Sequence, residues 1–89
     1  MQFEWDPDKN TVNQKKYGVS FEEALQIWQE PYVEIDNIAY TTTETRSATL
    51  GKIAGKLYVA IWTKRRRKIR LISVRRARKN EEKIYQEKV

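Results

Sequence analysis

Basic side chains are concentrated in one segment of the chain. Ten of the sixteen residues from 64 to 79 are lysine or arginine, and none is acidic. Planar guanidinium groups grip phosphate oxygens through paired hydrogen bonds, and they would stabilise the dianionic phosphorane that forms when an RNA 2′-hydroxyl attacks its neighbouring phosphate. The arginines that could form such a clamp are Arg46, Arg70, Arg75 and Arg76. The segment predicts binding to nucleic acid, or to an acidic partner that competes for the same surface, and a solvated basic edge is the simpler alternative.

The chain contains no histidine and no cysteine. This composition excludes imidazole acid–base pairs, Ser-His-Asp triads, thiolate nucleophiles, and zinc or iron–sulfur sites built from these ligands, so we expect no metal and no cofactor. Any general base must then be a lysine or a carboxylate such as Glu23, and any general acid a tyrosine or a lysine. Helix capping is the simpler interpretation of Glu23.

A second polar group falls on one face of a predicted helix. Lys9, Asn13, Lys16 and Tyr17 are spaced so that their side chains follow one line along the helix. This pattern suits a functional face and a solvated face equally well. The three tryptophans are expected in the core.

The length and composition suit one small domain over residues 1–89, of which 39% are hydrophobic and 34% charged. Residues 1–44 hold three lysines and nine acidic residues, a net charge of −6, whereas residues 45–89 hold fifteen basic and three acidic residues, a net charge of +12. The apolar runs are too short to span a membrane, and the first residues do not form a signal sequence. We therefore expect a cytoplasmic protein.

Local signals predict the elements of the acidic half, which are a strand over residues 2–5, a helix over residues 7–17 and a helix over residues 20–30. Asp6 caps the first helix, and Gly18 closes it because glycine accepts a left-handed backbone. Ser20 and Glu23 form a capping box at the start of the second helix. Pro31 ends that helix.

The basic half predicts a sheet. Four runs rich in β-branched and aromatic residues lie at residues 32–35, 39–43 extending towards 50, 57–63 and 68–74. We expect an antiparallel meander with turns over residues 51–56 and 64–67, in which the strand over 57–63 is central because both of its faces are apolar. A charged terminal helix should follow over residues 76–87. The predicted class is α+β.

The residues as a set resemble the BrnT family of toxins from bacterial toxin–antitoxin modules, which are small ribonucleases with a RelE/ParE-like fold. The matching motifs, in chain order, are Phe3-x-Trp5-Asp6, Lys9, Asn13, Lys16-x-Gly18-Val19-Ser20-Phe21-x-Glu23-Ala24, Glu30-Pro31, Glu44-x-Arg46, Leu50-Gly51, Leu57-x-Val59, Thr63, Arg67, Ile69-Arg70-Leu71-Ile72-Ser73-x-Arg75-Arg76-Ala77, Glu81, Glu82 and Tyr85. Their order and spacing over most of the chain carry the resemblance.

The resemblance implies a metal-independent endoribonuclease that inhibits translation. It also implies a BrnA-like antitoxin that neutralises the toxin and binds operator DNA in the complex. The catalytic residues that it indicates are Lys16, Glu23, Arg46, Arg70, Arg75 and Arg76. The residues expected to bind RNA, from the resemblance and the charge pattern together, are Lys9, Tyr17, Arg67, Lys68 and Arg78.

The chain departs from the family pattern at two positions. The family usually has histidine where this chain has Tyr17, and alanine is common where it has Val74. A tyrosine would serve as an acid with a higher ordinary pKa than histidine, which makes binding of RNA a firmer prediction than its cleavage. A nucleic-acid-binding module without catalysis and a domain that docks an acidic protein are therefore the alternatives.

Overall fold

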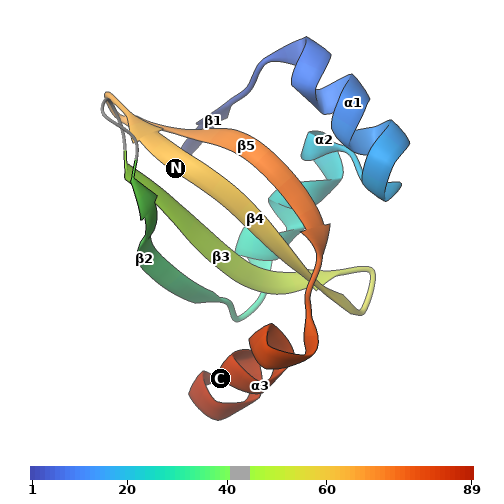
Figure 1. Cartoon of the computed structure of the whole chain (residues 1–89), viewed down its shortest axis with the longest axis vertical. Coiled ribbons are helices and arrows are strands. Elements are labelled where there is room, and N and C mark those ends of the chain that lie inside the picture. The colour runs from blue at the N-terminus through green and yellow to red at the C-terminus, as the bar shows by residue number, and fades with distance from the viewer. Residues whose placement is uncertain (41–44) are drawn as a thin grey trace.

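The computed structural model describes residues 1–40 and 45–89, with no account of the side chains of residues 37–40. A five-stranded sheet in the order β1-β5-β4-β3-β2 forms its centre. Helices α1 and α2 lie on one side of this sheet, and α3 lies near one end of the long strands (Figure 1). The predicted α+β class, with a short first strand, helices, a largely antiparallel sheet and a terminal helix, is confirmed.

The first elements form where the local signals predict them. Strand β1 spans Gln2–Glu4 and helix α1 spans Pro7–Tyr17. The carboxylate of Asp6 accepts a hydrogen bond from the backbone N–H of Asp8, and Gly18 closes α1 with a φ of 72°. Both predicted caps of this helix are therefore confirmed.

The predicted second helix changes character along its length. Helix α2 spans Phe21–Ala24 and continues as the 3₁₀ helix η1 over Leu25–Gln29, before an extended Glu30. The capping box is present, because Ser20 N–H donates to Glu23 and Glu23 N–H donates to the Ser20 hydroxyl. The start and the end agree with the prediction, whereas the tighter second half does not follow from any local signal.

The meander has the predicted number of strands with different boundaries. The strands are β2 (Val33–Tyr40), β3 (Thr45–Ile53), β4 (Lys56–Arg65) and β5 (Lys68–Arg76). The runs at 32–35 and 39–40 belong to one strand, because a register shift between Ile35 and Ala39 lets β2 continue. Residues 41–43 of the predicted second run and Glu44 lie outside the described residues.

The turns are shorter than predicted, and the terminal helix starts later. Only Ala54 and Gly55 separate β3 from β4, and only Arg66 and Arg67 separate β4 from β5. Helix α3 spans Lys79–Lys88, so the expected start at residue 76 is wrong. Pairing with Tyr58 of β4 keeps Arg76 in β5.

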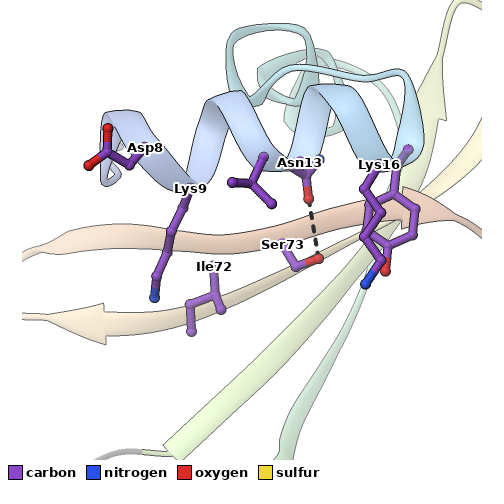
Figure 2. Close-up of a pocket in the computed structure, with 8 residues that line it drawn as sticks. Asp8, Lys9, Asn13, Lys16, Ile72 and Ser73 are labelled. Carbon is purple, nitrogen blue, oxygen red and sulfur yellow. Dashed lines mark hydrogen bonds between the residues drawn. The ribbon is translucent and has the colours of Figure 1, made fainter.

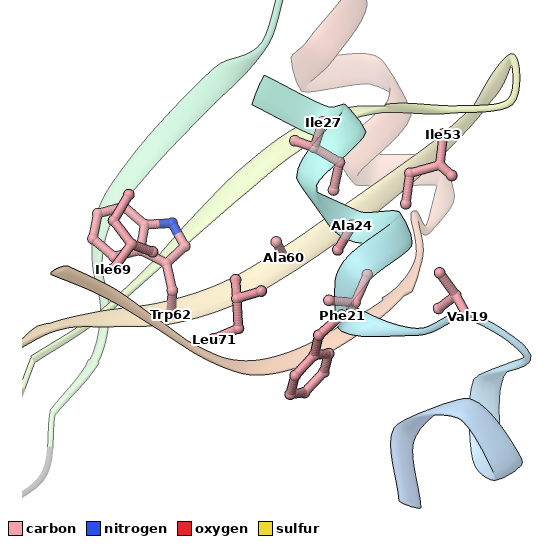
Figure 3. Packing of buried hydrophobic residues seen from close by; sticks show 10 residues of the cluster. Val19, Phe21, Ala24, Ile27, Ile53, Ala60, Trp62, Ile69 and Leu71 are labelled. Atoms are coloured by element: carbon pink, nitrogen blue, oxygen red, sulfur yellow. The ribbon is translucent and has the colours of Figure 1, made fainter. Parts of the chain in front are cut away.

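Strand β4 is central, as predicted, with a core on each face. On one face, Phe21, Ala24 and Ile27 of the helical layer pack over β4 and β5 (Figure 3). On the other face, Tyr85 of α3 packs with Leu50 and Val59. Strand β1 runs parallel to β5 and pairs with residues 68–70, a pairing that the sequence did not indicate.

Candidate active site

A groove lies between α1 and the edge of β5 (Figure 2). Because β1 pairs with β5 only at residues 68–70, helix α1 meets the part of this edge that β1 does not reach. The groove has a volume of about 290 Å³ and is open to solvent. Its lining includes Lys9, Val12, Lys16, Tyr17, Ile72 and Ser73.

Asn13 fastens α1 to this edge. Its side chain is buried, and its amide oxygen accepts hydrogen bonds from Val74 N–H at 3.1 Å and from the Ser73 hydroxyl at 3.3 Å. Its Nδ2 donates to the carbonyl oxygens of Val74 at 2.9 Å and of Val19 at 3.0 Å. The amide thus pairs with both backbone groups of Val74, as a neighbouring strand would.

Lys16 and Tyr17 stand at the end of the groove, in the last turn of α1. The ammonium nitrogen of Lys16 lies 5.2 Å from the centroid of the Tyr17 ring, within the range of a cation–π contact. Both side chains are exposed. Because Asn13 is one turn away, its hydrogen bonds set the position of both groups against β5.

Arg75 is the arginine of β5 next to this helix end. Its two terminal nitrogens donate to the two carboxylate oxygens of Glu81, at 2.8 and 2.9 Å. These hydrogen bonds are the main cause that raises the pKa of Arg75 above its ordinary value, and Tyr17 contributes to the same shift. The same hydrogen bonds lower the pKa of Glu81, so this carboxylate is ionised at neutral pH. The ion pair of Arg75 with Glu81 therefore lies within electrostatic range of Tyr17, beside the groove whose lining does not include Arg75.

Arg46 and Arg70 lie in a row across the sheet, separated by Thr63. Arg46 pairs with Thr63 in register, and Thr63 pairs with Arg70. Arg70 Nη1 donates to Glu4 at 2.9 Å, and both side chains are about 30% exposed. The β4 partners of Arg70 and Arg75 are Thr63 and Val59, so the two arginines are about 13 Å apart along the strands.

Two other candidate catalytic residues point elsewhere. The carboxylate of Glu23 accepts from Ser20 N–H in the capping box, and Glu23 does not line the groove between α1 and β5. Arg76 lies with its guanidinium carbon 5.5 Å from the centroid of the Tyr58 ring, on the face covered by α1 and α2, whereas Arg75 pairs with Val59 of the opposite core. Adjacent residues of a strand point to opposite faces, so these two arginines do not form one clamp.

The residues expected to bind RNA are all exposed and fall into three regions. Lys9 and Tyr17 line the groove. Arg67 and Lys68 lie at the β4–β5 turn, far along β5 from Arg75. Arg78 is the N-cap of α3.

Two searches of the described residues bear on the kind of site. In residues 1–40 and 45–89, no group of three or more acidic side chains is arranged to hold a metal ion. No helix in the same residues is long and apolar enough to cross a membrane.

A comparison with protein families gives one assignment. The family of BrnT ribonuclease toxins of type II toxin–antitoxin systems matches residues 5–81. This chain is a member of the BrnT family. No curated protein matches the chain. The resemblance drawn from the motifs is thereby confirmed, and a ribonuclease toxin of this kind implies an RNA substrate and an antitoxin partner.

The BrnT match covers α1, the whole sheet after β1 and the first residues of α3, so both sides of the groove lie inside it. Sequence reasoning missed two residues of this site. Asn13 appeared in a polar stripe and as a position that matches the family, and Glu81 as a matching position, and neither was expected to position a site residue. The available signal for Glu81 was its place three residues after the N-cap of α3, where a carboxylate accepts a hydrogen bond from the N-cap backbone. In the structure, Arg78 N–H donates this hydrogen bond to Glu81 at 2.8 Å.

Proposed function

We propose that this BrnT protein is a metal-independent endoribonuclease whose active site is the groove between α1 and β5. The observation that supports this proposal most is that Lys16 and Tyr17 line the end of an open groove, with Arg75 within electrostatic range of Tyr17. Two cations and a phenol beside an open groove are the groups needed for phosphodiester cleavage without imidazole. Arg46 and Arg70 lie too far along the sheet to contact the same phosphate, and they are proposed to hold a neighbouring part of the RNA.

The proposed reaction is an intramolecular transphosphorylation. The RNA 2′-hydroxyl oxygen attacks the adjacent phosphorus, its proton passes to water in the open groove, and a 2′,3′-cyclic phosphate forms as the bond to the 5′-oxygen breaks. Lys16 and Arg75 stabilise the negative charge that accumulates on the phosphate oxygens. Tyr17 donates the proton to the leaving 5′-oxygen.

Glu81 has a positioning role in this proposal. Its carboxylate holds both terminal nitrogens of Arg75, so the guanidinium is oriented before RNA arrives. Its lowered pKa makes it a weak base, which leaves electrostatic and geometric support as its contribution.

The biological role that follows is inhibition of translation in the cytoplasm through cleavage of RNA. A BrnA-like antitoxin would neutralise the toxin, and the complex would bind operator DNA through the antitoxin. Growth arrest on expression without the neighbouring antitoxin gene, and its relief on co-expression, would support both parts of this role.

A nucleic-acid-binding module without catalysis is the second candidate. It is favoured by the ion pairs of the two arginines, because Arg75 is held by Glu81 and Arg70 by Glu4. An arginine whose donors are occupied by a carboxylate has less capacity to clamp a transition state.

The test is cleavage of RNA by the purified protein in the presence of EDTA. Arg75→Gln and Tyr17→Phe should each lower the cleavage rate by about 100-fold or more, and the products of the parent protein should end in 2′,3′-cyclic or 3′-phosphate. Lys16→Gln should also lower the rate, whereas Lys15→Gln, its exposed neighbour outside the groove, should not. Tight binding of RNA that stays intact in EDTA, or equal losses in the Lys15 and Lys16 variants, would contradict the proposed site.

A further inference from the structure

The turn between β4 and β5 is built from four consecutive basic residues. Arg65 and Lys68 form the last pair of the two strands, and Arg66 and Arg67 connect them. All four side chains are exposed. The turn lies at the end of the sheet away from α3 (Figure 1).

The backbone of this turn is strained. Arg66 has a φ of 60°, in the left-handed region that residues with a Cβ rarely adopt. A two-residue turn of this kind favours glycine at its first position. In the β3–β4 turn both residues have a positive φ, 51° at Ala54 and 80° at Gly55, and one of the two is a glycine.

The charges of this turn also oppose folding. Arg65 and Lys68 are directly opposite each other in the ladder, where like charges repel. Among the described residues no carboxylate forms an ion pair with any of the four basic side chains. The repulsion in this exposed turn is relieved by a ligand that supplies negative charge at regular spacing, which is the property of a phosphodiester chain.

A hollow adjoins the turn and gives such a chain a place to lie. It has a volume of about 590 Å³ and is lined by Gln2, Glu4 and the four basic residues. The carboxylate of Glu4 is held by Arg70 and so does not neutralise the turn.

We propose that this basic turn, residues 65–68, is a second nucleic-acid site that binds the sugar–phosphate backbone of the RNA substrate away from the cleavage site. The inference rests on the proposed function, because it extends the same bound RNA. The β4 partners of Lys68 and Arg75 are Arg65 and Val59, so these two basic residues are about 20 Å apart along the strands. A stacked single strand rises about 3.4 Å per nucleotide, so an RNA must be about seven nucleotides long to reach both sites.

The first experiment compares oligonucleotides of two lengths with the variant Arg65→Gln/Arg67→Gln. For RNA of about 12 nucleotides, kcat/KM at low salt should fall by about 10-fold, whereas for RNA of about four nucleotides it should not change, because the short strand does not reach the turn. The matched control is Lys83→Gln/Lys88→Gln, which removes two exposed charges from α3 and should leave both values unchanged. Equal losses for both lengths, or equal losses in the control, would overturn the proposal.

A DNA strand of about 12 nucleotides tests the turn without cleavage, because it has no 2′-hydroxyl. Phosphate contacts do not distinguish DNA from RNA, so the Arg65→Gln/Arg67→Gln variant should lower the slope of log affinity against log salt by about 1.4 for this probe. An unchanged slope would refute the second site. A parent protein that shows this dependence and leaves RNA intact would instead refute the proposed ribonuclease activity and leave the binding site standing.

Arg66 gives a second, independent readout. Arg66→Gly removes the strain and a charge together, so it should raise the Tm of the free protein by a few degrees while weakening binding of the DNA strand about 3-fold to 10-fold. Arg66→Ala removes the charge and keeps the positive φ, so it should weaken binding without raising the Tm. A gain in stability from Arg66→Gly with unchanged affinity would show that the turn does not bind phosphates.

Discussion

Glu81 organises the end of β5 through three hydrogen bonds. Both terminal nitrogens of Arg75 donate to its carboxylate, and so does the backbone N–H of Arg78. One side chain thereby begins α3 and orients the arginine proposed to stabilise the transition state. Because the pair is mostly buried, with side-chain exposures of 19% and 16%, it is less screened than an open surface ion pair.

The pH dependence of stability should reveal this pair. The folded state lowers the pKa of Glu81 below its ordinary value of 4.5, so the ion pair stabilises the fold above that value and its contribution is lost as the pH falls through the lowered pKa. Glu81→Gln should therefore reduce the free energy of unfolding by about 1 kcal/mol at pH 7 and by much less at pH 3. Urea unfolding at both pH values measures the difference.

The pKa of Glu34 is shifted in the opposite direction. Burial, with a further contribution from Asp36, raises the pKa of Glu34, so its ionisation destabilises the fold as the pH rises. Glu34 is present in both the parent and the Glu81→Gln variant, so its effect cancels when their free energies of unfolding are subtracted. If the difference in the free energy of unfolding between the parent and Glu81→Gln stayed constant from pH 7 to pH 3, the stabilisation would not come from the ion pair.

Helix α1 takes the place of a strand along part of β5. A sheet edge left with unpaired N–H and C=O groups tends to pair with another chain, and the Asn13 amide satisfies both groups of Val74. The helix that presents Lys16 and Tyr17 is therefore attached to the strand that presents Arg75 through the side chain of Asn13. This attachment gives two sequence-distant elements a defined register.

Asn13→Ala should weaken both the fold and the site. Truncation leaves the backbone groups of Val74 buried without their partner, which should lower the free energy of unfolding by about 2–3 kcal/mol. Asn13→Asp places a buried carboxylate oxygen against the carbonyl oxygens of Val74 and Val19, so at pH 7 it should be at least as destabilising as the alanine variant. Chemical denaturation gives the order, and Asn10→Ala, a partly exposed neighbour on α1, is the comparison for a less buried amide. An alanine variant as stable as the parent would rule out this role of Asn13.

The whole molecule joins an acidic helical half to a basic sheet half. The two halves carry net charges of −6 and +12, and an ion pair between Glu4 and Arg70 connects them. The helical layer nevertheless meets the sheet through apolar contacts, with Phe21, Ala24 and Ile27 fully buried. Charge sets which surfaces attract a polyanion, whereas apolar burial sets how the two layers pack.

Gly51 decides how closely these layers approach. A Cβ at this position would lie 2.7 Å from the Ile27 Cγ2 and 2.9 Å from the Ile27 carbonyl oxygen. The backbone oxygen has no rotamer to escape to, so Gly51→Ala should lower the free energy of unfolding by about 1–3 kcal/mol. Thermal unfolding measures the loss, and a Tm equal to that of the parent would show that η1 shifts without cost.

Several features of this fold could be predicted because they depend on residues close in sequence. The Asp6 cap, the Gly18 closure and the Ser20–Glu23 capping box involve donors and acceptors within four residues, and all three form as predicted. The central position of β4 followed from apolar residues on both of its faces. The ends of β2 and the start of α3 did not follow, because ladder pairing with β3 and β4 overrides local preference.

Residue types and local spacing were enough to establish the absence of imidazole chemistry, the basic segment, the family and the α+β class. They could not establish which cations share a site, because that depends on the face of the sheet to which each strand residue points. Arg75 and Arg76 are adjacent in the chain and lie on opposite faces, whereas Arg75 and Tyr17 are far apart in the chain and interact. Side chains alternate between the two faces of a strand, and in β5 a register shift interrupts this alternation, so that Leu71 and Val74 face the same core. The face to which each arginine points therefore depends on the pairing of the strands and on the helix that packs at the strand edge, which local spacing does not give.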